Sequence, residues 1–361
     1  MKLALIRRQF SATGGAELYL QRLLQALVRG GHEPHLFAES WQGQLAGVQL
    51  HAVPVTGDRA VRATRFADAV AAELGKHSFD VTFSLERTHS QDVYRAGDGV
   101  HRVWLQRRRH YAQWWRRPFV GLGAFHRNLM KLEARTFDPA NTRHLIVNSD
   151  MVKREVLEHF PFPASRIHLV RNGIDLDRYR RGQRTTTRER FGIKPDDTLL
   201  LFVGSGWERK GLRFVLRAFH RLKAPRVKLL VVGKGSPPFT IPHGTIFAGP
   251  MSDVENAYAA ADLLLFLPIY EPASNVVAEA LVSDLPVITS SLNGASEIIT
   301  PRKNGTVIAD PRDTSAVVDA IRYWILQRGR AEMPPKEELS LERNVEETLA
   351  VLKLAAKEKR R

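Results

Sequence analysis

The chain has 361 residues, no cysteine, a formal net charge of +16 and a pI near 10.3. The lack of cysteine excludes disulfides, thiolate metal sites and cysteine nucleophiles, and no apolar run approaches the roughly 18 residues of a membrane-spanning helix. The length favours two domains. The positive charge predicts an anionic partner, for which the candidates are nucleic acid, anionic lipid and a phosphorylated glycolipid.

Short apolar runs alternate with helical patterns through the N-terminal half. Strands are expected at 2–6, 35–38, 48–55, 81–85 and 93–96, and helices at 16–28 and 60–74. The first run, KLALI, is expected to be a strand rather than a signal peptide. This alternation predicts a parallel, doubly wound sheet, which binds ligands at the carboxyl ends of its strands.

Several polar or glycine residues fall at those predicted strand ends. Gly14 and Gly15 follow the first strand, where they form either a tight turn or a close backbone approach to a phosphate or sugar. Glu17 either faces an acceptor or is a solvated acid in the first helical turn. Asp98 and His101, in AGDGVH, either bind sugar hydroxyls and assist proton movement or belong to a polar turn.

The segment 102–135 is basic and aromatic, with nine lysines and arginines and one acid. Tyr111, Trp114 and Trp115 are expected to share one helical face. Such a segment suits the surface of an anionic membrane or the acceptor, whereas an ordinary packed helix or a nucleic-acid site are the alternatives. The residues assigned to this surface are Arg107, Arg108, Arg109, Trp114, Trp115, Arg116 and Arg117.

The middle of the chain connects two halves. Strands are expected at 144–148 and 167–170, with a helix from the Ser149 cap to about residue 160. The polar run 180–190 is predicted to be an interdomain linker. The expected division is therefore 1–180 and 181–340, followed by a terminal helix at 341–361.

The C-terminal half opens with a buried strand at 199–203 and the sequence GSGWERKG. Gly204 lets the backbone adopt conformations that other residues avoid. Arg209 and Lys210 lie at the start of a helix that is expected to run to about residue 222. Two cations beside a helix N-terminus favour a diphosphate site that needs no metal; the alternative is a solvated surface pair. Gly233 follows the next strand, at 228–232, without the spacing of a P-loop.

The segment 262–285 combines a buried strand at 263–267, a loop and a helix. Glu271 lies on the loop, Ser274 or Asn275 caps the helix, and Glu279 lies about one turn inside it. The free amides near Ser274, Asn275 and Val276 form an anion-binding surface. Both carboxylates are therefore expected to face one ligand that carries a phosphate and sugar hydroxyls.

Further elements complete the C-terminal half. Strands are expected at 245–248, 286–289 and 306–308, a helix capped by Ser252, a glycine turn at 294, and helices at 314–328 and 341–359. The basic tail KEKRR is expected to be solvated. The thirteen histidines show no HExxH spacing, so no metal site is expected.

Taken together, EPASNVVAE after an apolar strand and GSGWERKG resemble the signature of retaining GT-B glycosyltransferases of family 4. Within this family the chain looks most like the enzymes that add glucose to an inner-core heptose of lipopolysaccharide, through YRAGDGVHR and the basic aromatic insert. The resemblance implies two Rossmann-like, doubly wound domains that face a central cleft, with the terminal helix crossing back to the first domain.

The resemblance also implies a role for each candidate residue. Arg209 and Lys210 would offset charge on the departing diphosphate, Glu279 would bind the ribose, and Glu271 would bind the donor sugar. Gly14, Gly15, Gly204 and Gly233 would approach the donor closely. The implied donor is a nucleotide sugar, UDP-glucose above all, used without a cofactor or a metal.

The acceptor implied is the lipopolysaccharide core at the cytoplasmic face of the inner membrane, where the enzyme would be a peripheral protein. Another polysaccharide or glycolipid acceptor is the alternative within the family. The alternatives from other classes are a basic nucleic-acid-binding protein, which leaves both glutamates and the Arg209–Lys210 pair unexplained, and an inactive scaffold. We expect no nucleic-acid partner.

Overall fold

The computed structural model of the chain describes residues 1–10, 15–42, 46–238 and 240–360. It divides into two compact units, of which the first comprises 1–171 and 341–361 and the second comprises 172–340. The boundary predicted at 180/181 thus falls inside the second unit. None of the helices in the described part of the chain has the length and apolar character that crossing a membrane requires.

The first unit is built on a parallel sheet of seven strands in the order β5-β3-β1-β6-β7-β8-β9. The strands are β1 (Lys2–Ile6), β3 (Glu33–Ala38), β5 (Gln49–Ala52), β6 (Val81–Ser84), β7 (Gln91–Arg95), β8 (Thr142–Val147) and β9 (Ile167–Leu169). A separate parallel pair joins β2 (Gln9–Phe10) to β4 (Ser40–Trp41). The order reverses between β1 and β6, as in a doubly wound sheet.

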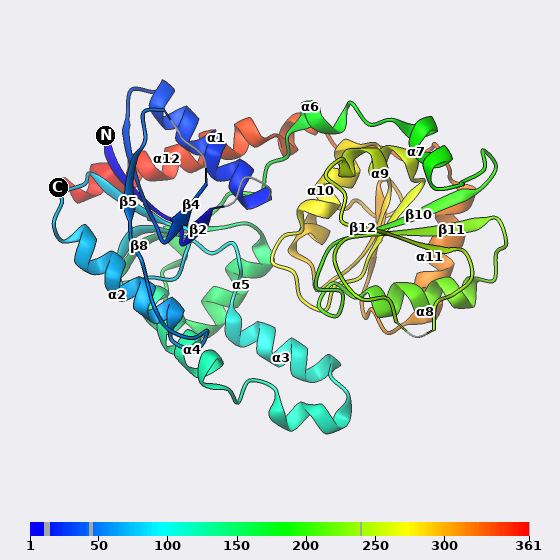
Figure 1. Ribbon diagram of the computed structural model, residues 1–361, viewed down its shortest axis with the longest axis horizontal. Helices are drawn as coiled ribbons and strands as arrows, with labels where there is room; N and C mark the ends of the chain where they lie inside the picture. The colour runs from blue at the N-terminus through cyan, green and yellow to red at the C-terminus, as the bar shows by residue number, and fades with distance from the viewer. Residues whose placement is uncertain (11–14, 43–45, 239, 361) are drawn as a thin grey trace. The chain divides into compact units, whose positions relative to one another are not determined.

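Helices cover both faces of this sheet. On one face α1 (Gly15–Arg29) buries its leucine stripe together with α12 (Leu341–Lys359). On the other, α2 (Arg62–Leu74) packs Phe66 and Val70 on Ile6 and Phe37. Figure 1 shows α12, in red, lying beside α1 and the blue strands of the first unit. The predicted doubly wound architecture is confirmed.

The basic aromatic insert is not one continuous helix. It forms α3 (His101–Tyr111), a 3-10 helix η1 (Trp114–Phe119) and α4 (Ala124–Thr136). Tyr111 is buried at the end of α3, whereas Trp114 lies on η1 with 76% of its surface exposed. The predicted shared helical face is therefore wrong, because Ala112 has extended backbone and ends α3 before the tryptophans. The first unit also contains α5 (Asp150–His159), which Ser149 caps as predicted, and η2 (Ala164–Arg166).

The second unit is a parallel sheet of six strands in the order β12-β11-β10-β13-β14-β15. The strands are β10 (Thr198–Val203), β11 (Val227–Val232), β12 (Thr245–Gly249), β13 (Leu263–Phe266), β14 (Val287–Ser290) and β15 (Gly305–Ile308). The helices are α6 (Leu176–Tyr179), α7 (Arg184–Arg190), α8 (Leu212–Leu222), α9 (Val254–Ala260), α10 (Asn275–Val282), η3 (Gly294–Ile298), α11 (Thr314–Leu326) and η4 (Lys336–Leu339). The sheet reverses between β10 and β13, so this switch point is the expected ligand site.

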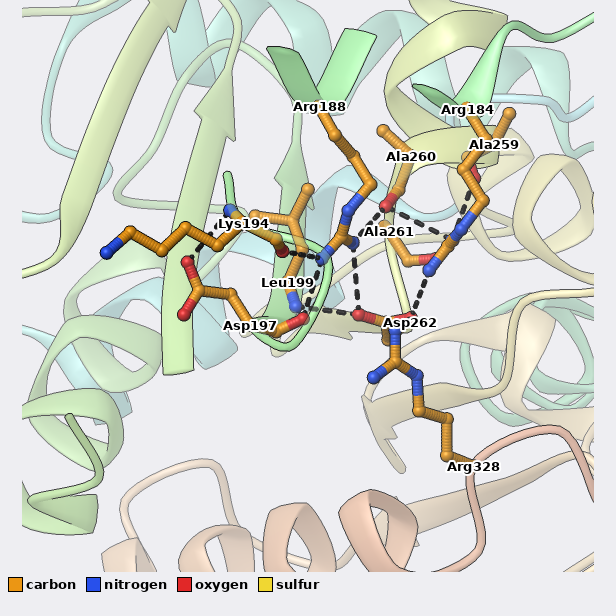
Figure 2. A network of polar contacts seen from close by, with 10 residues as sticks. All are labelled: Arg184, Arg188, Lys194, Asp197, Leu199, Ala259, Ala260, Ala261, Asp262 and Arg328. Carbon is orange, nitrogen blue, oxygen red and sulfur yellow. Dashed lines mark hydrogen bonds and ion pairs between the residues drawn. The ribbon is translucent and has the colours of Figure 1, made fainter. Parts of the chain in front are cut away.

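The predicted linker at 180–190 is wrong, because its second half is helix α7 packed in the second unit. Figure 2 shows Arg184 and Arg188 of α7 converging with Arg328 on the carboxylate of Asp262. Arg188 is buried and also donates to the Ala260 and Asp197 carbonyl oxygens. This polar segment therefore belongs to the structure of the second unit, because its arginines donate hydrogen bonds to carbonyl oxygens at the end of α9.

One smaller prediction is also wrong, since the N-cap of α9 is Asp253 rather than Ser252. In the basic tail Lys357, Lys359 and Arg360 are exposed, as predicted. Two of these residues are also ion-paired: Lys359 Nζ lies 2.9 Å from Asp92 Oδ2, and Arg360 Nη2 lies 2.8 Å from Asp80 Oδ1. Both acids belong to the first unit, so the tail helps to hold α12 there.

Candidate active site

The candidate site of the second unit lies where the loops after β10 and β13 meet. The amide of Ile269 donates to the carbonyl oxygen of Arg209 at 2.9 Å, which joins the two loops. At Gly211 the backbone has φ +76°, and a Cβ there would stand 1.7 Å from the Leu267 oxygen. Only glycine permits this approach, so the sequence RKG is what lets both loops reach one point.

At this point two cations face one carboxylate. Arg209 Nη2 lies 3.3 Å and Lys210 Nζ lies 3.8 Å from Glu271 Oε2. The Glu271 side chain is 12% exposed and that of Lys210 17%, whereas Arg209 is 40% exposed. The structure therefore brings together three predicted residues, and Lys210 is the more desolvated cation of the pair. A cation held in this setting acts strongly on a nearby anion, because water screens it poorly.

The start of α10 adds backbone donors beside Glu271. Ser274 is the N-cap, but its side chain makes no capping bond, and its buried Oγ has no hydrogen-bond partner in the described part of the chain. The first amides of α10, at Asn275 and Val276, lack helical acceptors as at any helix start. Buried hydroxyls are normally hydrogen-bonded, so Ser274 Oγ and these amides form a surface suited to a phosphate.

Asn293 and Asn172 hold this loop in place. Asn293 is fully buried, and its Oδ1 accepts from the amides of Ser274 and Ala295. Asn172 donates through Nδ2 to the Ala273 oxygen and to Asn275 Oδ1. Each asparagine precedes a glycine, in Asn172-Gly173 and Asn293-Gly294. This turn-forming Asn-Gly pattern was the signal available in the sequence.

Glu279 lies in α10 and is held by tyrosines. Tyr258 Oη donates to Glu279 Oε2 at 2.6 Å, and Tyr179 is a second hydrogen-bond donor to this carboxyl. Burial raises the pKa of Glu279, although these two tyrosines, Arg178 and Lys210 favour the charged form. The positive charge of Lys210 therefore interacts electrostatically with both Glu271 and Glu279, the two acids predicted for the site. No sequence pattern pointed to the tyrosine partners of Glu279.

The loop after β11 closes the other side of the loop after β10. Gly233 has φ +135°, and a Cβ there would stand 2.2 Å from the Gly204 oxygen. Trp207 donates through Nε1 to the same oxygen at 2.9 Å and packs on Gly235, where a Cβ would lie 2.6 Å from the indole. Gly204 and Gly233 are thus adjacent, as a shared donor-binding role requires, and Trp207 is an aromatic wall that sequence analysis did not assign.

The candidate residues of the first unit gather after β7. Asp98 is exposed, whereas His101 is buried and its Nε2 lies 3.0 Å from His126 Nδ1. Burial, then Arg87 and His126, lower the pKa of His101 to about 4. His101 is therefore neutral at pH 7. A neutral imidazole suits a hydrogen bond to a hydroxyl rather than an ionic contact with an anion.

Glu133 positions His101. Its buried carboxylate accepts from the His101 amide at 2.6 Å and forms an ion pair with Arg87 at 3.0 Å. The same carboxylate accepts a hydrogen bond from the Arg102 amide. Glu133 thus caps the start of α3, whose N-cap residue Val100 has no side-chain acceptor. In the sequence Glu133 stands out only as the one acid of the basic insert, and this isolation was the available signal.

Other predicted residues are placed as follows. Gly14 lies outside the described residues, Gly15 is the first residue of α1, and Glu17 follows it in the helix. The surface set is mostly exposed: Trp114, Trp115, Arg116 and Arg117 on η1, with Arg107 and Arg109 on α3, while Arg108 is half-buried. Phe119 and Leu122 add exposed apolar surface beside them. All of these residues belong to the first unit.

Two family models match the chain. "Glycosyltransferase Family 4" matches residues 13–178 and "Glycosyl transferases group 1" matches residues 197–327. Together these ranges cover both units and well over half of the chain.

Individual relatives agree with these models. The lipopolysaccharide glucosyltransferase WaaG of Escherichia coli K12 is 26% identical over 331 residues, which is 87% of each chain. The lipopolysaccharide 1,2-N-acetylglucosaminetransferase of Salmonella typhimurium is 28% identical over 55% of this chain and 57% of its own.

Solved structures extend the likeness to the whole chain. The crystal structure of WaaG, a glycosyltransferase involved in lipopolysaccharide biosynthesis, covers 98% of each chain at 25% identity with a TM-score of 0.77. Anabaena HepE in complex with UDP-glucose has a TM-score of 0.68 at 14% identity, over 98% of this chain and 100% of its own, and shows the fold alone. With the two sheets and the matched families, the chain belongs to the GT-B glycosyltransferases of family 4 and is related to the lipopolysaccharide glucosyltransferase WaaG.

Proposed function

We propose that this glycosyltransferase moves glucose from UDP-glucose, with retention of the anomeric configuration, to a heptose of a lipopolysaccharide core. The observation that carries the proposal is the Lys210–Glu271 pair with Arg209 beside the unpartnered Ser274 hydroxyl. The relative WaaG is a lipopolysaccharide glucosyltransferase, which supports glucose as the sugar and lipopolysaccharide as the acceptor. A different polysaccharide or glycolipid acceptor is the alternative.

In this proposal the diphosphate lies on Ser274 Oγ and the first amides of α10. Arg209 and Lys210 offset the negative charge that grows on the departing phosphate, so no metal is needed. An ionised carboxylate accepts about four hydrogen bonds. Glu279, which accepts two from tyrosines, therefore retains positions for the ribose hydroxyls.

Glu271 binds hydroxyls of the donor sugar. The retaining step follows a same-face route: the acceptor oxygen forms the new bond to the anomeric carbon as the bond to the phosphate oxygen breaks. The leaving phosphate takes the acceptor proton, so no protein nucleophile is required. His101, neutral at pH 7, and Asp98 hydrogen-bond the hydroxyls of the sugar substrates.

Calorimetric titration with UDP, GDP, ADP and their glucose conjugates in metal-free buffer tests the donor site. We expect UDP and UDP-glucose to bind, and Glu279→Ala to weaken both at least tenfold. Glu332→Ala is the matched control, since that exposed acid pairs with Lys303 at another place in the second unit. Failure of every nucleotide, with tight and salt-sensitive binding to RNA instead, would overturn the proposal.

We further propose that η1 docks on the anionic inner face of the cytoplasmic membrane. Trp114 and Phe119 are 76% and 73% exposed beside Arg116 and Arg117, a combination that suits an anionic lipid interface. Replacing Trp114, Trp115, Arg116 and Arg117 together should reduce binding to phosphatidylglycerol vesicles and leave UDP binding unchanged. Leu326→Ser, at another exposed apolar residue, is the control, and unchanged vesicle binding by the quadruple variant would refute the docking.

A further inference from the structure

Three possible metal ligands from different elements meet at the edge of the first sheet. They are His51 of the edge strand β5, Glu73 of α2 and His77 just after α2. Their candidate ligand atoms all lie within 4.8 Å of one another. The three residues do not form a sequence motif, because only the fold brings the end of α2 beside β5.

The separation of two of these ligands is already close to that of a metal site. His77 Nε2 lies 3.7 Å from Glu73 Oε1. Tetrahedral bonds of about 2.0–2.2 Å place neighbouring ligand atoms roughly 3.4 Å apart, so a small side-chain movement suffices. Glu73 Oε2 meanwhile contacts Lys76 Nζ at 2.6 Å, which leaves Oε1 for the metal.

A hydrogen-bonded chain behind His51 fixes the form of its imidazole. Glu33 Oε1 lies 3.0 Å from His35 Nε2, and His35 Nδ1 lies 2.9 Å from His51 Nε2. An ionised carboxylate can only accept hydrogen bonds, so Glu33 Oε1 accepts the proton of His35 Nε2. His35 Nδ1 is then the acceptor for His51 Nε2, which leaves the lone pair of His51 Nδ1 for a metal.

This chain resembles the outer partners of known metal-binding histidines. A ligating histidine usually donates its other ring nitrogen to a carboxylate or another acceptor, which fixes the tautomer. The stacking of His51 on Phe37, with centroids 4.4 Å apart, holds the ring in place.

We propose that His51, Glu73 and His77 bind one divalent transition-metal ion of the zinc class, with water completing the coordination. Two imidazoles and one carboxylate favour zinc, nickel or cobalt over magnesium and calcium, which prefer oxygen ligands. The ion joins the edge strand β5 to the end of α2. It lies apart from Asp98 and His101, because α2 leads into the amino-terminal end of β6 whereas those residues follow the carboxyl end of β7.

The test is calorimetric titration of the full chain with ZnCl2, together with thermal unfolding. We expect one zinc per chain and a rise in Tm of about 5 °C at a hundredfold excess over Kd. His77→Ala and Glu73→Gln should each lower the affinity at least tenfold. Both side chains are exposed or half-buried, so these variants should fold.

Two further variants sharpen the test. Glu33→Ala removes the acceptor at the end of the outer chain, at an exposed residue, and should lower the affinity about tenfold. His89→Ala is the matched control, because His89 also pairs with an acid of α2, Asp68, at 2.6 Å and lies outside the three-residue group. It should bind zinc like the parent chain.

Either of two results would overturn the proposal. One is the absence of zinc binding at millimolar concentration, and the other is equal binding by the parent, His77→Ala and Glu73→Gln chains. The outcome is independent of the proposed reaction, since EDTA should lower the Tm of the zinc-loaded protein without changing its turnover.

Discussion

Replacing Asp262 by Asn is expected to destabilise the second unit strongly. Asp262 Oδ1 lies 2.7 Å from Arg184 Nη2 and 3.0 Å from Arg328 Nη2, while Oδ2 lies 3.4 Å from Arg188 Nη1 (Figure 2). The amide of Leu199, in β10, also donates to Oδ2 at 2.8 Å. The substitution keeps the shape of the side chain and removes its charge.

The buried arginine determines the size of the effect. The side chain of Arg188 is 7% exposed, so it would keep a buried charge without its counter-ion, for which losses of about 3–5 kcal/mol are typical. Arg184 and Arg328 are 42% and 41% exposed, and each contributes under about 1 kcal/mol because water screens it. The carbonyl acceptors that Arg188 retains place the expected loss near the lower end, about 3 kcal/mol.

Urea-induced unfolding of the full chain, followed by circular dichroism, measures this loss. Asp310→Asn is the matched control, because Asp310 pairs with Arg312 at 2.6 Å but both side chains are about two-fifths exposed. We expect the control to lose less than about 1 kcal/mol. If Asp262→Asn lost no more than the control, the reasoning from burial would be refuted.

Three further predictions concern the candidate site. Lys210→Ala should lower kcat about 10²–10³-fold, since removal of one preformed donor to a developing anion has this effect, and Kd for UDP should change little; a change confined to Kd would contradict the assignment. Tyr258→Phe removes the 2.6 Å bond to Glu279 and should weaken UDP binding several-fold in calorimetry, whereas unchanged affinity would show that Glu279 needs no positioning. Folding lowers the pKa of His101 from 6.5 to about 4, so His101 binds fewer protons in the folded than in the unfolded chain. Its contribution to stability is therefore present above pH 6.5 and is lost as the pH falls towards 4. His101→Gln should flatten this part of the Tm–pH curve, and an unchanged curve would contradict the lowered pKa.

Local periodicity predicted most of the secondary structure. The terminal helix was expected at 341–359 and spans Leu341–Lys359, because its apolar positions recur at helical spacing. The short apolar run of 263–267 was likewise expected to be a buried strand, and β13 is Leu263–Phe266. Such patterns depend on neighbours within a few residues, which the sequence contains directly.

The core of the candidate site was expected from the family resemblance, which assigned Arg209, Lys210 and Glu271 to one donor. The three residues do lie together, because their loops follow strands whose carboxyl ends meet at one edge of a parallel sheet. The sequence by itself thus determined the fold class, the order of the elements and this group of charges.

Only the tertiary structure decided which distant side chains became partners. The arginines of α7 anchor the second unit because Asp262, more than seventy residues away, lies beside them. Glu279 acquired two tyrosine donors, and His51 was brought to Glu73 and His77. The physical reason is the same in each case: a polar side chain is stabilised by whichever group the packing of the sheets and helices places next to it, and no local pattern records that neighbour.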